Sequence, residues 1–204
     1  MLKNVKISLR LGFSFSLVLV FMILLILVSL NQIKVSRSLF DRIINVNNVR
    51  MHLANNMIDH TREVSITLRN ILLLKDREKT LELKSRIDSI RNLYDADFIK
   101  CEGLFTTGDT ISFDIAAKIK ASQDVSRQLN NKVIDLAMAG KYEEAIILMN
   151  QQASKKVALW ITYIDEFINH NEDRTLMRSL EAEKAQEDAR LLMLILGTVA
   201  IAIA

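Results

Sequence analysis

The chain has 204 residues, half of them hydrophobic and a quarter charged, and its formal net charge is only +3. It contains no proline and five glycines, which argues against a turn-rich β fold and favours an all-α protein. The small net charge, without a long basic run, argues against a nucleic-acid-binding surface. Cys101 is the only cysteine, so an internal disulfide is excluded, and we expect its side chain to be a small core residue.

An apolar segment near the N-terminus, residues 11–30, contains no charged side chain. Twenty helical residues span roughly 30 Å, the thickness of the hydrocarbon core of a bilayer. A cleaved signal peptide is the alternative, but its apolar part is usually about 7–15 residues long and a small-residue cleavage site follows it. No such site is present here. We therefore predict an uncleaved transmembrane helix over residues 11–31.

Charge sets the expected orientation of this helix. Lys3, Lys6 and Arg10 precede it, and no acidic residue lies among them. Positive residues favour the cytoplasmic side, so we expect a cytoplasmic N-terminus (1–10) and a periplasmic domain (32–190).

A second apolar segment, residues 191–204, ends the sequence. Fourteen residues are too few to cross a bilayer as a helix. We expect this segment to be the beginning of a second transmembrane helix, and the chain to be a fragment.

Between these segments, apolar residues recur at helical spacing in four stretches. The first runs to the polar residues 75–78 and has one gap, at Arg50; the second runs to residues 106–110 and the third to Gly140. The fourth begins near Tyr142 and continues to the end. Short connections make neighbouring helices antiparallel, which predicts an up-down-up-down four-helix bundle. In the third stretch the expected core residues are Ile115, Ile119, Val125, Leu129, Val133 and Leu136.

The sequence lacks the patterns that carry enzyme chemistry. It has no glycine-rich phosphate loop, no nucleophile elbow and no zinc-protease motif. Its three histidines, His52, His60 and His170, do not cluster along the chain. We expect no catalytic activity, no cofactor and no bound metal.

Arg62 and Arg69 are the most informative charged residues. Seven residues are two helical turns, so both side chains project from one face, about 10 Å apart. Ile66 lies between them and makes that face partly apolar. Two guanidinium groups placed in this way can bind a small anion. The alternatives are an ion pair with a carboxylate on a neighbouring helix, or a solvated rim.

Polar residues also gather early in the fourth helix, at Gln151, Gln152 and Ser154. In an antiparallel bundle of these lengths, the start of this helix lies near the far end of the first. We therefore expect Gln151, Gln152 and Ser154 to lie at the level of Arg62 and Arg69 and to complete a ligand site. A solvated face is again the alternative.

The order of these parts resembles the bacterial methyl-accepting chemotaxis receptors with a four-helix-bundle sensor domain. The resemblance rests on the basic start and first span, on Arg62 and Arg69 before the Leu-rich turn of residues 71–74, and on residues 139–145, Ala-Gly-Lys-Tyr-Glu-Glu-Ala, which open the fourth helix. It covers essentially the whole chain.

The resemblance implies a homodimer in the inner membrane whose first bundle helices face each other. It implies that Arg69, with Arg62, holds the carboxylate of an organic acid or an amino acid. A small shift of the fourth helix would then carry the signal to a cytoplasmic histidine kinase and its adaptor. Two alternatives stay open: the sensor region of a histidine kinase or diguanylate cyclase receptor, and a membrane-anchored scaffold without a ligand.

Overall fold

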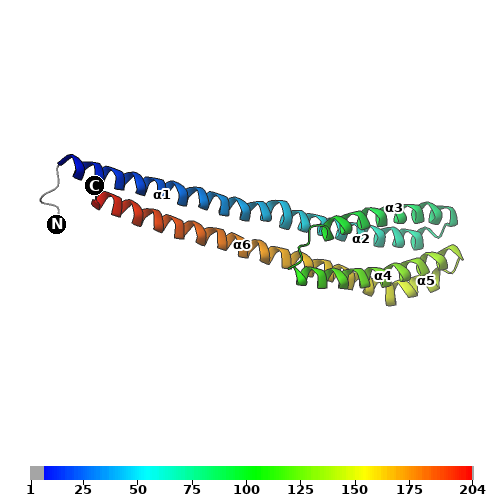
Figure 1. Ribbon diagram of the computed structural model, residues 1–204. Helices are drawn as coiled ribbons and strands as arrows, with labels where there is room; N and C mark the ends of the chain where they lie inside the picture. Colours follow the sequence, from blue (N-terminus) through cyan, green and yellow to red (C-terminus); the bar gives the residue numbers. More distant parts are fainter. Residues whose placement is uncertain (1–6, 204) are drawn as a thin grey trace. The chain divides into compact units, whose positions relative to one another are not determined.

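The computed structural model describes residues 7–203, and every regular element in this range is helical (Figure 1). Lys3 and Lys6, which carry the expected basic start, lie outside the described residues. The elements in chain order are α1 (Ile7–Arg42), the π-helical turn η1 (Ile43–Asn47), α2 (Asn48–Leu74), α3 (Arg77–Glu102), α4 (Thr110–Met138), α5 (Tyr142–Leu148), the π-helical turn η2 (Met149–Ala153) and α6 (Ser154–Ile203).

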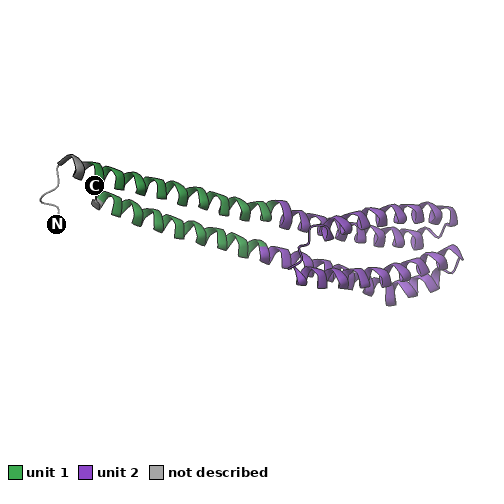
Figure 2. Cartoon of the chain, viewed as in Figure 1, with its two compact units in different colours: residues 1–44, 175–204 green, residues 45–174 purple. Residues whose placement is uncertain are grey.

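The chain divides into two compact units, shown in two colours in Figure 2. The first unit contains residues 1–44 and 175–204. In it α1 lies beside the C-terminal part of α6, and the Ser29 hydroxyl lies 3.3 Å from Met193 Sδ. The helix that runs through Phe15–Leu74 is long and apolar enough to cross a membrane, with a mean hydropathy of 2.5 in its most apolar window. Within the described residues it is the one helix that meets this criterion.

The second unit, residues 45–174, is a four-helix bundle. Its helices are α2, α3, α4 and the continuous segment of α5, η2 and the first part of α6, joined by short connections and antiparallel to their neighbours (Figure 1). The predicted all-α, up-down-up-down bundle is therefore confirmed. The fourth helix differs in one respect from the prediction, because a π-helical turn interrupts it at residues 149–153.

Local sequence explains where the bundle helices end. Lys75 ends α2 in the left-handed conformation (φ 51°), and the Asp76 carboxylate then caps α3 by accepting hydrogen bonds from the amides of Glu78 and Lys79. Gly140 follows α4 with a φ of 74°, a conformation in which glycine has no steric penalty. The sequence-based expectation that Gly140 closes a helix is thus confirmed.

The apolar core of the bundle consists of two clusters of buried side chains. The first is centred on Tyr94 and Trp160, whose indole Nε1 donates to the Tyr94 hydroxyl at 2.9 Å. Cys101 belongs to this cluster and is 3% exposed, as expected of a core residue; burial raises the pKa of its thiol to about 12. The second cluster contains Leu68 and Val133.

The prediction for the core face of α4 was partly wrong. Val125 is 43% exposed, whereas Ser122, Ser126 and Asn130 are buried. The six-residue step from Ile119 to Val125 does not fit the 3.6-residue period, and the helix continues in phase through the three polar residues. The core of the bundle is therefore polar along part of α4.

Candidate ligand-binding site

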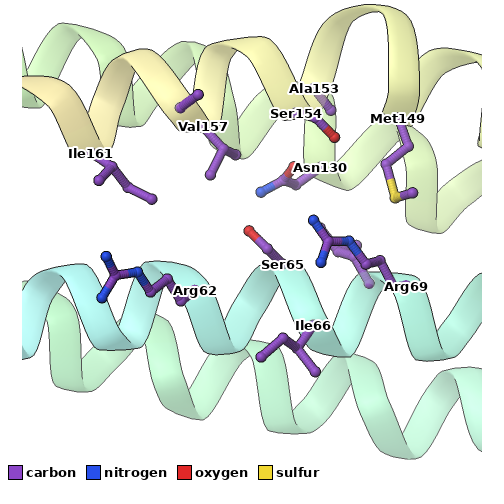
Figure 3. Close-up of a pocket in the computed structure, with 12 residues that line it drawn as sticks. Arg62, Ser65, Ile66, Arg69, Asn130, Met149, Ala153, Ser154, Val157 and Ile161 are labelled. Carbon is purple, nitrogen blue, oxygen red and sulfur yellow. The ribbon is translucent and has the colours of Figure 1, made fainter.

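A cavity of about 330 Å³ lies between α2 and the beginning of α6 (Figure 3). Two further segments contribute to its lining: α4 supplies Asn130, and the π-helical turn η2 supplies Met149 and Ala153. The lining contains four of the six residues that the sequence analysis proposed for a ligand site, namely Arg62, Ile66, Arg69 and Ser154.

The two α2 arginines border this cavity, and their side chains are largely free of protein partners. The Arg62 side chain is 60% exposed, and among the residues that the structure describes it is paired only with Asp59 of its own helix, at 3.4 Å. Arg69 is exposed and forms no ion pair or hydrogen bond with any described residue. Neither arginine forms the ion pair with a neighbouring helix that was considered as the alternative, at least within residues 7–203. Both guanidinium groups can therefore bind an anion from solution.

The walls of the cavity are mostly apolar. Leu68 of α2 lines it, together with Val157 and Ile161 of α6, which Figure 3 shows on the opposite side from α2. The Ser65 hydroxyl donates to the backbone oxygen of Thr61 at 3.0 Å, which leaves its lone pairs as acceptors. A small organic anion would find a positive rim and an apolar interior here.

The other two predicted site residues are placed differently. Gln151 and Gln152 are exposed and do not line the cavity, although they lie in the turn η2 that borders it. In their place the structure brings Met149 and Ala153 to the cavity. Met149, Ala153 and Val157 recur every four residues and share the face that borders the cavity, whereas Gln151 and Gln152 lie off this face. Residues 149–153 form the π-helical turn η2. Such turns are frequent at functional sites.

A second group of charged side chains lies in the same unit but outside the cavity. We call it the Asp109 cluster: Arg50, Asp109, His170 and Arg174. Asp109 precedes α4 and is 5% exposed, and Arg50 of α2 is 1% exposed. Arg50 Nη1 donates to Asp109 Oδ2 at 2.8 Å, while Arg174 of α6 pairs with the same carboxylate. His170 Nε2 lies 3.7 Å from Asp109 Oδ1.

The surroundings of this cluster determine its charge state. Burial alone would raise the pKa of Asp109, but the contacts with Arg50 and Arg174 outweigh burial and hold that pKa at about 2. Arg50 also donates to the backbone oxygen of Leu104, and its guanidinium carbon lies 4.9 Å from the centre of the Phe105 ring. The cluster thus ties α2 and α6 to the connection between α3 and α4.

In the sequence Arg50 is visible only as a gap in an apolar stripe, and Asp109 lies in a predicted turn. An arginine at a core position of an otherwise apolar stripe is a usable sign of a buried ion pair, because a buried charge requires a partner. Its partner could not be identified from the sequence, since Asp109 is 59 residues away.

Comparison with known protein families agrees with this architecture. Residues 4–185 match the family described as a four helix bundle sensory module for signal transduction. The chain belongs to this family. The match covers most of the 204 residues, including α2, the cavity and the whole bundle. Members of this family are sensory modules and not catalytic domains. No curated protein and no solved structure gives a significant match.

Proposed function

We propose that this sensory module binds a small carboxylate in the cavity between α2 and α6, as the ligand-binding part of a chemotaxis receptor. The observation that carries the proposal is the pair of arginines, Arg62 and Arg69, on the rim of a cavity with apolar walls. Neither guanidinium is neutralised by a carboxylate from another helix within the described residues. Charge-assisted hydrogen bonds from arginine to a carboxylate are among the stronger polar contacts in proteins.

The signal would leave the site along α6. This helix runs without a break from Ser154, which lines the cavity, to Ile203. A ligand changes the position of such a helix only if it binds one position more tightly than another. Contacts to both α2 and α6 supply that difference, because the distance between the two helices changes when α6 moves.

The proposed receptor is a homodimer joined along α2. Exposed residues of this helix recur in alternating steps of three and four, the spacing of a helix-pairing seam. They are His52, Asn55, Asp59, Arg62, Ile66, Arg69 and Leu73. Most are polar, so the seam would associate weakly by itself. Because Arg62, Ile66 and Arg69 belong both to the seam and to the cavity, a ligand would strengthen the dimer.

The ligand site is tested by calorimetric titration of the whole chain in lipid nanodiscs with a panel of organic acids and amino acids. At least one carboxylate should bind, and Arg69→Ala should weaken it by about 10- to 100-fold through loss of a charged hydrogen bond. Arg77→Ala is the matched control, because Arg77 is also exposed but does not line the cavity. Equal effects of the two substitutions would contradict the proposal.

The proposed topology places residues 32–190 in the periplasm of a bacterial inner membrane. It rests on the apolar helix near the N-terminus, on the basic residues before it and on the family match. Lys155→Cys in a Cys101→Ala background provides one exposed thiol in the bundle. A membrane-impermeant maleimide should label it in intact spheroplasts. Labelling only after lysis would place the bundle in the cytoplasm.

A further inference from the structure

The deepest polar group of the cavity is the amide of Asn130. This residue comes from α4, is 1% exposed, and is the one cavity-lining residue from that helix. Figure 3 shows its side chain between the two helices, below Ser154 and facing Ser65 and Arg69. The arginines at the rim are exposed, so the polar groups lie at two depths, with apolar walls between them.

The Asn130 amide has unused hydrogen-bonding capacity. Its Oδ1 is buried and has no hydrogen-bond partner among the described residues. Buried polar atoms of native proteins nearly always have a partner, and this one borders a cavity that can admit a ligand. A half-turn of the amide exchanges its oxygen and nitrogen, so the group can accept a hydrogen bond from the ligand or donate one to it.

The charged side chains that line the cavity determine which ligand group is favourable beside this amide. The lining contains two guanidinium groups and no carboxylate among the described residues. An ammonium group on the ligand would therefore lie near two positive charges without a negative partner, which is unfavourable in a partly desolvated site. A hydroxyl is neutral, and it can donate and accept, so it matches the amide in either orientation.

We propose that Asn130 determines the specificity of the site, selecting 2-hydroxy carboxylates over the matching acids that carry hydrogen or ammonium at the same carbon. This inference rests on the carboxylate site of the proposed function. The carboxylate binds Arg69 at the rim, the hydroxyl forms a hydrogen bond with the Asn130 amide, and the carbon chain packs against Leu68 and Val157.

Two series of matched acids test the inference by calorimetric titration of the whole chain in nanodiscs. The first is propionate, lactate and alanine; the second is succinate, malate and aspartate. In at least one series the hydroxy acid should bind about tenfold more tightly than both of its relatives, the effect of one buried hydrogen bond. Asn130→Leu should bring the dissociation constants of the hydroxy acid and the unsubstituted acid to within about twofold of each other.

A second variant keeps the test decisive if Asn130→Leu unfolds the bundle. Asn130→Asp has nearly the same shape and places a negative charge at the same depth. It should shift the preference toward alanine or aspartate, whose ammonium then has a partner. Ser126→Ala is the matched control: Ser126 is also buried on α4 with an unpaired hydroxyl, but it does not line the cavity. It should leave the preference unchanged.

The possible failures are distinguishable. Binding that requires Arg69 but does not separate lactate from propionate, or malate from succinate, would overturn the role of Asn130 and leave the carboxylate site standing. A preference that survives both Asn130 variants in the folded chain would overturn it as well. If no acid of either series binds the wild-type chain, this inference and the carboxylate site for such acids are both contradicted.

Discussion

The bundle uses arginine in two opposite ways, at the Asp109 cluster and at the cavity. Arg50 is 1% exposed, and its guanidinium group donates hydrogen bonds to the Asp109 carboxylate and to the backbone oxygen of Leu104. Arg62 and Arg69 are exposed, and no other helix within residues 7–203 offers them a carboxylate. The difference teaches that the environment of an arginine, more than its place on an apolar stripe, separates a structural charge from one that can bind a ligand.

The largest effect should come from breaking the buried ion pair. Asp109→Asn removes the negative partner of Arg50 and leaves a buried guanidinium without a counter-charge. We expect it to reduce the free energy of unfolding by about 3 kcal/mol or more. Urea denaturation followed by the fluorescence of Trp160, the only tryptophan, measures this loss. Asp59→Asn, which breaks the exposed pair with Arg62, is the control; an equally small effect of both would show that the cluster is not structural.

The next effect is a loss of stability in acid. The pKa of Asp109 is about 2 in the folded chain against an ordinary value of 3.8. The ionised Asp109 therefore contributes fully to the free energy of unfolding above pH 3.8. This contribution, roughly 2 kcal/mol in total, is lost as the pH falls toward 2. Urea denaturation of the wild-type chain and of Asp109→Asn between pH 5 and pH 2 should show a smaller decline for the variant. If the free energies of unfolding of the two chains decline in parallel, the low pKa of Asp109 is contradicted.

The smallest effect should come from an arginine of the cavity. Arg62→Ala removes only an exposed contact with Asp59, so the free energy of unfolding should change by less than about 0.5 kcal/mol. The same denaturation experiment measures it, beside a titration showing that carboxylate binding is weakened. A loss of stability comparable to that of Asp109→Asn would mean that Arg62 has a structural role, and the contrast between the two regions would disappear.

Much of the fold followed from periodicity. The spacing of apolar residues predicted four helices, and Gly140 predicted the end of the third, because these features depend on local sequence alone. The predicted core face of α4 was wrong after Ile119, because the next apolar residue is Val125 whereas the helical phase leads to Ser126 and Asn130.

The candidate site was predicted only in part. Arg62 and Arg69 share one face of one helix, and their spacing in sequence is enough to bring them together. Asn130 lies on another helix, and its place in the cavity depends on how α4 packs against α2 and α6. Gln151 and Gln152 were predicted from their polarity and their level in the bundle, whereas the four-residue steps from Met149 to Ala153 and Val157 place those side chains at the cavity.

The central claim is that a carboxylate lies between α2 and α6 at Arg69, and a crystal structure of the chain with a bound acid tests it most directly. A carboxylate oxygen should lie about 2.7–2.9 Å from a guanidinium nitrogen of Arg69. A carboxylate bound elsewhere, for instance in the shallow groove beside Lys118 and Lys156, with the cavity unchanged, would contradict the account.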